Sequence, residues 1–252
     1  MDPLNANDAL RHIAFDGAYN FRDLGGYPTL DGHATRWRRL YRSDSLAHLS
    51  EVDEARFLEL AITTVIDLRS PSEIAHGGVA RRGTGASRLL NAAVNDWPDS
   101  PGEATPASVL SDLSQRYLQY LEEGGPAFVS AVRAMSHAEN LPIVFNCFWG
   151  KDRSGVLAAI TLSCLDVEPS AIAQDYALSS RATPHLIERL RLDPVYRDTL
   201  DRTPPALLAS DFETMERFID DAEKKFGGLR AWALSAGLLT SELAALREEL
   251  VA

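Results

Sequence analysis

The chain has 252 residues, of which 45% are hydrophobic and 24% charged, a balance typical of a globular protein with a substantial core. Its formal net charge of -11 disfavours nucleic acids and anionic membranes as partners, so an anionic substrate would need a local basic pocket. No interdomain linker stands out, and we expect a single domain over residues 1–252.

The N-terminal part alternates predicted strands and helices. An amphipathic helix is expected over residues 51–60, because Ser50 and Asp53 form a pattern typical of a capping box. Residues 95–107 contain three prolines and are the loosest stretch of the chain. Strands are predicted at residues 36–43, 63–68 and, from a weaker pattern, 86–94.

The second half is dominated by helices. Only one further strand is predicted, the apolar run at residues 141–146. From Pro169 onward the chain is predicted to be mostly helical, with breaks at Pro184, Pro194 and Pro204-Pro205. Further helices are predicted at residues 111–123, 127–138 and 155–167. Strands alternating with helices indicate an α/β sheet fold, and we expect a helical C-terminal extension at about residues 183–252.

Cysteine usage and the N-terminus bear on location. Cys147 and Cys164 are too few for a disulfide-built fold and indicate a reducing compartment. The N-terminus lacks a basic region followed by an apolar run, and no stretch has the length of a spanning helix. We therefore expect a cytoplasmic protein without a membrane anchor. The scattered histidines suggest no metal site, no cofactor is expected, and nothing in the sequence indicates the oligomeric state.

The stretch VFNCFWGKDRSGVL, residues 144–157, combines a thiol, a guanidinium and two glycines between a predicted strand and a helix. Gly150 and Gly155 allow the backbone to curl so that several amides point inward, where the helix N-terminus also favours negative charge. Arg153 adds a planar fork that matches a phosphoryl group. This positive environment favours the thiolate of Cys147, which can then attack phosphorus. The spacing Cys147-x5-Arg153 thus predicts a phosphate cradle with its nucleophile at the bottom.

The loop NCFWGKDRSG resembles the signature loop of the cysteine-dependent protein tyrosine phosphatase superfamily. More narrowly, it is similar to bacterial tyrosine/serine phosphatases with an HC-x2-GKDR-[ST]-G loop. The stretches NFRDLGGY, LYRSDSL, VIDLRSPSE and QDYALS also resemble motifs of that family in their usual order, so the resemblance covers roughly residues 15–182. It implies a protein-tyrosine-phosphatase-like fold, a central and mostly parallel sheet flanked by helices. It also implies hydrolysis of phosphomonoesters through a phosphocysteine intermediate.

The resemblance assigns roles within the loop. Cys147 matches the nucleophile and Arg153 the phosphate clamp. Ser154 matches the hydroxyl that assists breakdown of the phosphocysteine. Lys151 and Asp152 match the pair that distinguishes this subfamily, in which the lysine is associated with a second phosphate or with phosphoinositides. Asp152 is a candidate acid or water-positioning residue.

Two features depart from the family pattern. Asn146 stands where the family has histidine, and an amide can donate a hydrogen bond but cannot carry charge. The substitution is compatible with activity that persists at a higher thiol pKa, with weakened activity, or with an inactive phosphate-binding protein. Phe148 and Trp149 are bulkier than the residues that the family often has. Trp149 is interpreted either as a wall of the substrate pocket or as packing against the sheet.

The leaving group of a phosphomonoester needs a proton, and two aspartates are candidates for supplying it. Trp97-Pro98-Asp99 resembles the mobile acid loop of eukaryotic tyrosine phosphatases. Asp152 lies inside the signature loop itself. The sequence does not decide between Asp99 and Asp152.

Two further charged pairs lie in the matching motifs. Asp67 and Arg69 follow a predicted strand, at the sheet edge where α/β proteins place ligand sites, and Arg22 and Asp23 lie near the N-terminus. Structural support is the alternative interpretation of both pairs. Cys164 is expected in the core, too far along its helix to reach Cys147. The candidate substrate-binding residues are Arg22, Asp23, Asp67, Arg69, Asn146, Phe148, Trp149, Gly150, Lys151 and Gly155.

The leading hypothesis is therefore a metal-independent, cysteine-based phosphatase. A rhodanese-like sulfurtransferase also uses a loop cysteine, but the arginine spacing and the accompanying motifs count against it. The phosphorylated substrate remains open among a phosphoprotein, a phosphoinositide and a small metabolite, such as a nucleotide-like or sugar phosphate of a biosynthetic pathway.

Overall fold

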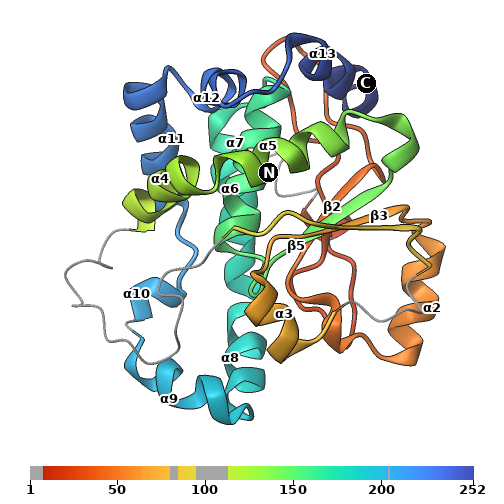
Figure 1. The fold of residues 1–252 in the computed structure, drawn as a ribbon, viewed down its shortest axis with the longest axis vertical. Helices are drawn as coiled ribbons and strands as arrows, with labels where there is room; N and C mark the ends of the chain where they lie inside the picture. The colour runs from red at the N-terminus through yellow and green to blue at the C-terminus, as the bar shows by residue number, and fades with distance from the viewer. Residues whose placement is uncertain (1–7, 80–84, 95–112, 204) are drawn as a thin grey trace.

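The computed structural model describes residues 8–79, 85–94, 113–203 and 205–252, and its strands form a 5-stranded sheet. The strands are β1 (Arg22–Asp23), β2 (Leu40–Ser43), β3 (Thr64–Asp67), β4 (Arg88–Asn91) and β5 (Ile143–Asn146). Their order is β1-β2-β5-β3-β4, and of these strands only β1 runs antiparallel to its neighbour. The prediction of a central, mostly parallel sheet is confirmed (Figure 1).

The strand that precedes the cysteine loop lies in the middle of the sheet. Asn146, the last residue of β5, pairs with Ser43 of β2 on one side and with Asp67 of β3 on the other. All three strands run in the same direction, so they end at one edge of the sheet. Ligand sites of open α/β sheets lie at this carboxyl edge, and Cys147 is the first residue beyond it.

The two faces of the sheet pack against separate hydrophobic clusters, because successive strand side chains alternate between faces. Ile66 and Phe145 belong to the larger cluster, whereas Val65 and Val144 belong to the smaller one. The smaller cluster is covered by α2 (Glu51–Glu59) (Figure 1). The helices of the larger cluster are α4 (Leu113–Glu123), α5 (Gly125–Met135), α6 (Asp152–Cys164), α7 (Pro169–Ala177), α11 (Phe212–Phe226), α12 (Leu229–Ser235) and α13 (Thr240–Leu250).

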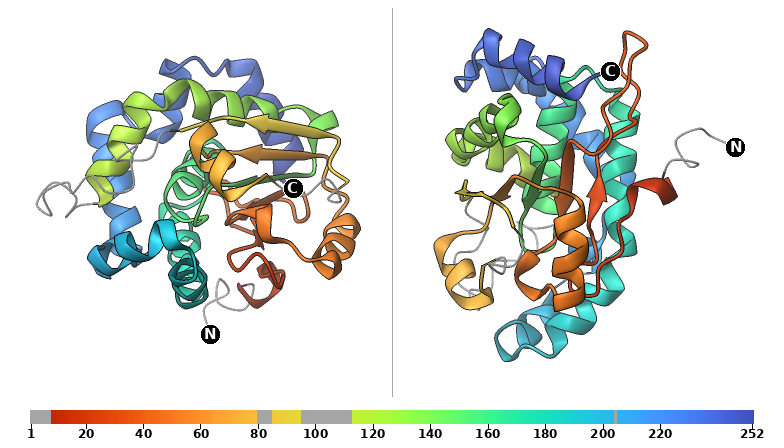
Figure 2. Two further views of the ribbon diagram at one scale, coloured as in Figure 1. Left: turned by 60° about the horizontal axis from the view of Figure 1, so that its bottom comes forward. Right: turned by 90° about the vertical axis from the view of Figure 1, so that its right-hand side faces the viewer.

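The residues predicted as a helical C-terminal extension share this larger cluster. Met215 of α11, Trp232 of α12 and Leu246 of α13 are all buried in it. Thr35 forms a bridge with Val251, and Figure 2 shows the end of the chain beside the loop that contains Thr35. The extension therefore shares the hydrophobic core of the sheet and does not form a core of its own.

The predicted proline breaks coincide with the starts of three shorter helices. Proline suits a first helical turn, where its missing N–H has no intrahelical partner to bond. These helices are α8 (Thr183–Arg191), α9 (Pro194–Arg202) and α10 (Pro205–Leu208). Short 3-10 helices cover Leu46–His48, Ala138–Asn140 and Leu178–Arg181.

Some predicted boundaries move for local reasons. The strand predicted over residues 36–43 is confined to β2, because Arg38 adopts a left-handed φ of 60° that ends an extended run. The helix predicted from residue 155 already begins at Asp152, since the loop turns directly into it. The capping box at Ser50 is confirmed.

One short helix, α3 (Pro71–Gly77), was not predicted from the sequence. Its capping box is formed by Ser70, which accepts the Glu73 amide, and by Glu73, whose carboxylate accepts the Ser70 amide at 2.8 Å. Over the described parts of the chain, no helix is both long and apolar enough to cross a bilayer.

Candidate active site

The predicted phosphate loop leaves β5 and closes on itself before α6 begins. Gly150 adopts a φ of 67°, and a side chain there would meet the backbone of Ser43 and Asp44 at 2.5 Å, so only glycine fits. The backbone N–H of Gly150 donates to Sγ of Cys147 at 3.2 Å. Cys147 is buried, with 2% of its surface exposed. The thiol therefore lies inside a curled loop and accepts a backbone hydrogen bond.

A fully buried arginine supports the back of this loop. Arg42 of β2 donates through Nη2 to the carbonyl oxygen of Gly150 at 2.6 Å and to that of Lys151 at 3.3 Å. In a trans peptide the N–H points away from the C=O. The amides of Lys151 and Asp152 are therefore turned away from Arg42, as an inward-facing anion nest requires.

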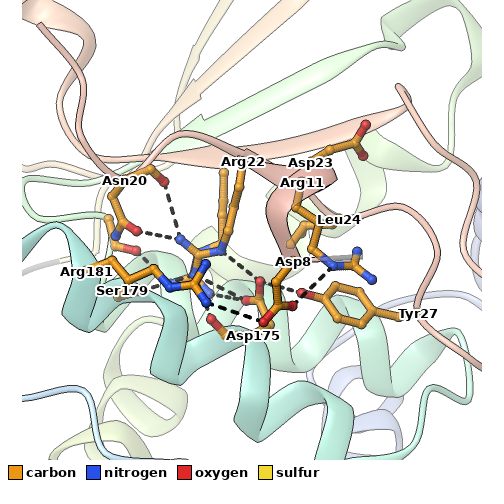
Figure 3. A network of polar contacts seen from close by, with 12 residues as sticks. Asp8, Arg11, Asn20, Arg22, Asp23, Leu24, Tyr27, Asp175, Ser179 and Arg181 are labelled. Carbon is orange, nitrogen blue, oxygen red and sulfur yellow. Dashed lines mark hydrogen bonds and ion pairs between the residues drawn. The ribbon is translucent and has the colours of Figure 1, made fainter. Parts of the chain in front are cut away.

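Arg42 is held in turn by Asp175 of α7, which Figure 3 shows at the centre of a polar network. Asp175 accepts Nη1 of Arg42 at 2.6 Å, Nε of Arg22 at 2.8 Å and the Tyr27 hydroxyl at 2.9 Å. Burial alone would raise the pKa of Asp175. The charges of Arg22 and Arg42 outweigh this effect and hold the pKa of Asp175 well below its usual range. Three of the motifs quoted from the sequence therefore meet behind the loop.

The N-terminal pair Arg22 and Asp23 belongs to this supporting layer. Arg22 also donates to the Ser179 hydroxyl at 3.1 Å and contacts Asn20 (Figure 3). Asp23 accepts the amides of Gly25 at 2.8 Å and Arg38 at 2.7 Å, so it fixes a turn. Burial raises the pKa of Asp23 to about 6.

The guanidinium of Arg153 is oriented by a carboxylate that sequence reasoning missed. Nη1 and Nη2 of Arg153 each lie 2.6 Å from an oxygen of Glu73 in α3, and Nη1 also donates to the carbonyl of Val94 at 3.2 Å. Arg153 is 1% exposed, whereas the Glu73 side chain is 20% exposed, so the arginine side of this bidentate pair is the one shielded from water. The only local signal was the Ser70-x-x-Glu73 capping pattern inside the motif VIDLRSPSE.

Lys151 and Asp152 both have protein partners. Nζ of Lys151 donates to the carbonyl of Leu207 and, at 3.0 Å, to that of Ala209. It also lies 3.5 Å from Oδ1 of Asp152, whose side chain is 20% exposed. The Tyr117 hydroxyl donates to the same Oδ1 at 2.7 Å. Asp152 therefore borders both the solvent and a buried hydroxyl.

Ser154 is fully buried in the first turn of α6, and its hydroxyl has no hydrogen-bond partner among the described residues. Asn146 donates to Oδ1 of Asp67 at 3.3 Å. Asp67 forms a close pair with Arg69, with Nη2 at 2.6 Å from Oδ2, and Arg69 also reaches Ser45 and the carbonyl of Gly78. Asp67 and Arg69 thus tie together the segments that follow β2 and β3.

Aromatic side chains border the loop. The Phe148 ring lies 4.8 Å from that of Tyr196 in α9, and Tyr196 lies 5.5 Å from His76 in α3. His76 is also 3.3 Å from Asp193, which precedes α9. Burial raises the pKa of Tyr196, and the nearby charges of Glu73 and Asp193 raise it further, which favours the neutral phenol. Helix α9 therefore lies against both the loop and α3.

The remaining predicted residues are placed as follows. Trp149 is half-buried, and its carbonyl accepts Nδ2 of Asn20 at 3.1 Å. Asp99 lies outside the described residues. Cys164 is buried in the core as predicted, and burial raises its pKa to about 12. In the described ranges, no group of three or more acidic, histidine or cysteine side chains is arranged to hold a metal ion.

Comparison with known proteins agrees with this geometry. The sequence is similar to the triple specificity protein phosphatase PtpB of Mycobacterium tuberculosis, with 31% identity over 200 residues, 69% of this chain and 71% of that protein. A Cupriavidus necator protein whose name assigns it provisionally to the tyrosine-protein phosphatases is 30% identical over 192 residues, 71% of this chain and 67% of its own length. A tyrosine-protein phosphatase of Nostoc commune is 26% identical over 151 residues, 55% of this chain and 47% of its own length. The model of the tyrosine phosphatase family matches residues 13–252. The chain belongs to the tyrosine phosphatase family.

Proposed function

We propose that this protein hydrolyses phosphomonoesters through a phosphocysteine formed on Cys147. The observation that carries the proposal is the loop itself. A buried thiol accepts a backbone N–H inside a turn that opens into α6, and the first turn of α6 carries an arginine whose guanidinium is fixed by Glu73. A helix N-terminus, inward amides and an oriented arginine together bind a tetrahedral oxyanion. The reducing cytoplasm, expected from the cysteine usage, would keep such a thiol free.

The reaction has two displacements at phosphorus. In the first, the Cys147 thiolate forms an S–P bond while the P–O bond to the leaving group breaks, and an aspartic acid protonates the departing oxygen. Arg153 and the loop amides stabilise the equatorial oxygens. In the second, water attacks phosphorus, its proton passes to the carboxylate, and the S–P bond breaks to release phosphate and thiolate. The Ser154 hydroxyl, which has no hydrogen-bond partner among the described residues, is well suited to donate to the departing sulfur.

This proposal is tested by following p-nitrophenyl phosphate hydrolysis in excess EDTA and by acid-quenching the reaction with a ³²P-labelled aryl phosphate. Turnover in EDTA together with label trapped on Cys147 is the expected result. Binding of phosphate without turnover would instead identify an inactive phosphate-binding protein, the reading that Asn146 favours. Sulfur transfer from thiosulfate to cyanide without phosphatase activity would identify a sulfurtransferase.

Leaving-group dependence separates the two candidate acids. We expect Asp152→Asn to lower kcat/KM for an alkyl phosphate by about 100-fold and for p-nitrophenyl phosphate far less, because the nitrophenolate needs little protonation. Asp99→Asn is the matched comparison, since it also removes one carboxylate from a predicted acid position. Measuring both esters with both variants decides the assignment. If the selective loss follows Asp99, Asp152 is not the acid, and a uniform loss in both variants argues against either.

The substrate class is the finer part of the proposal. The ring pair Phe148 and Tyr196 borders the loop, and the net charge of -11 repels acidic phosphopeptides more than a compact metabolite. We infer that a small phosphomonoester with a planar ring, such as a nucleotide-like one, is the preferred substrate. The Mycobacterium tuberculosis relative is named a triple specificity protein phosphatase, so phosphopeptides belong in the comparison.

Trp149→Ala tests this preference. We expect it to lower kcat/KM for the nucleotide-like substrate by about tenfold, the value of one base–aromatic stack. The effect on p-nitrophenyl phosphate should be smaller. Trp149→Phe, which keeps a ring, should retain most of the activity. A panel of nucleotide, sugar and inositol phosphates and phosphotyrosine peptides gives the ranking. Preference for peptides or phosphoinositides, or a ranking unchanged by Trp149→Ala, would contradict the inference.

A further inference from the structure

A chain of hydrogen bonds joins Asp152 to two buried tyrosines to which the sequence motifs assign no role. The Tyr117 hydroxyl of α4 donates to Oδ1 of Asp152 at 2.7 Å, and the oxygens of Tyr117 and Tyr176 lie 2.7 Å apart. Tyr117 has one proton, and it is given to Asp152, so Tyr176 of α7 must donate to Tyr117. The direction of the chain is therefore Tyr176 to Tyr117 to Asp152.

Both tyrosine rings are held rigidly. Tyr117 is 0% exposed, and its ring packs edge-on against Phe218 of α11, with centroids 5.7 Å apart. The Tyr176 ring rests on the backbone of Gly155, where an added Cβ would approach it to 3.0 Å. Gly155 of the signature loop thus leaves the space in which Tyr176 lies. Burial raises the pKa of Tyr117 well above its usual value, as does the neighbouring charge of Asp152, so its hydroxyl stays protonated and able to donate.

The carboxylate of Asp152 is bound on one side only. In the described part of the chain, Tyr117 and Lys151 both approach Oδ1, and the side chain keeps 20% of its surface exposed. A carboxylate fixed through one oxygen presents the other in a defined direction. An unrestrained surface aspartate would instead sample several rotamers and reach the reacting oxygen for only part of the time.

We infer that Tyr117 is a positioning residue for Asp152: its hydroxyl fixes the rotamer that presents Oδ2, which has no partner among the described residues, for proton transfer at the phosphate cradle. Tyr176, which rests on Gly155, supports Tyr117 by packing its ring edge-on against it. This inference rests on the proposed function, since it concerns the step in which Asp152 takes part. It also explains why a residue of α4, far from the loop in sequence, faces the start of α6.

The test uses isosteric substitutions, which remove a hydroxyl and leave the ring in place. Tyr117→Phe deletes the hydrogen bond to Asp152. Tyr176→Phe is the matched control, because it deletes one buried hydroxyl of the same chain but leaves the Tyr117–Asp152 bond intact. Asp152→Asn and the double variant Tyr117→Phe/Asp152→Asn complete a double-mutant cycle. For each protein, kcat and KM are measured with an alkyl phosphate and with p-nitrophenyl phosphate, and the trapped phosphoenzyme is quantified.

We expect Tyr117→Phe to slow the same step as Asp152→Asn, with kcat lowered about tenfold and KM nearly unchanged, because positioning is lost while the cradle is not. In the Asp152→Asn background, adding Tyr117→Phe should cause no further loss of kcat. Tyr176→Phe should lower the melting temperature about as much as Tyr117→Phe but leave kcat within about twofold.

Three results would overturn the inference. They are an unchanged kcat in Tyr117→Phe, an equal loss in Tyr176→Phe, and a loss that persists in full in the Asp152→Asn background. Each would show that the hydroxyl only satisfies buried polar groups. Failure of the proposed function has a different signature, since the wild-type protein would then trap no phosphocysteine with either ester.

Discussion

Replacing Cys147 with serine is expected to abolish turnover while the loop still binds phosphate. A serine hydroxyl stays protonated at neutral pH and is a poor nucleophile, whereas the loop amides and Arg153 are unchanged. We expect kcat to fall by at least about 10⁴-fold, the scale of losing a nucleophile in other covalent enzymes. Steady-state hydrolysis of p-nitrophenyl phosphate measures the loss, and calorimetric titration with inorganic phosphate measures the binding.

Cys164→Ser is the matched control for this experiment. Cys164 is the other cysteine of the chain, it is buried in α6, and burial raises its pKa to about 12. Such a thiol stays protonated near neutral pH, and it is buried in the core, so it cannot replace Cys147 as nucleophile. The control should lose stability, because a hydroxyl enters the core, but keep its turnover. Turnover near the wild-type level in Cys147→Ser would exclude a covalent mechanism.

Arg153→Lys is expected to lower kcat/KM by about 10²–10³-fold, although the positive charge is kept. The two terminal nitrogens of Arg153 bind both oxygens of Glu73, and Nη1 also reaches the carbonyl of Val94. A lysine ammonium is a point donor that cannot form this paired contact and present a planar edge to phosphate. Part of the expected loss in kcat/KM comes from weaker phosphate binding. Calorimetric titration of the variant with inorganic phosphate measures this part directly.

The comparison for Arg153→Lys is Arg133→Lys. Arg133 of α5 pairs with Glu242 of α13 and also donates to a backbone carbonyl, so it is a similar arginine outside the site. That variant should behave like the wild-type protein in both assays. A small effect of Arg153→Lys, within about threefold, would mean that charge alone suffices and that the fork geometry has no role.

The parts of the site that were predictable are the local ones. Cys147 and Arg153 lie in one short loop, and their spacing, the glycines and the flanking strand and helix are all visible in the sequence. The order of strands and helices likewise predicted an α/β fold, and the resemblance to the phosphatase family implied that its sheet would be mostly parallel. Asp99 stays a prediction, since it lies outside the described residues.

The supporting layer could not be predicted, because its members are distant in the sequence. Glu73 reaches Arg153 over 80 residues, and Asp175 reaches Arg42 over 133. In its own segment, neither Glu73 nor Asp175 differs from an ordinary charged residue, so the sequence does not show which arginine each one binds. Tyr117 resembles any apolar-face residue of a helix until the fold brings it to Asp152. The motifs VIDLRSPSE and QDYALS contain Glu73 and Asp175, but the sequence does not indicate which residues these two carboxylates bind.

The position of these partners also bears on how the molecule folds. The backbone of Ala34 bonds to that of Ala252, and the amide of Arg36 to the carbonyl of Leu250, so the segment leading into β2 is secured by residues more than 200 positions later. Closing such long loops costs little extra free energy, because the entropy grows only with the logarithm of length, but it slows folding. During synthesis, Arg42 of β2 would have no Asp175 to bind until α7 is made. The segment before β2 would lack its partners until the end of α13 is made. We therefore expect the support behind the phosphate cradle to form only once α7, which supplies Asp175 to Arg42, has been synthesised.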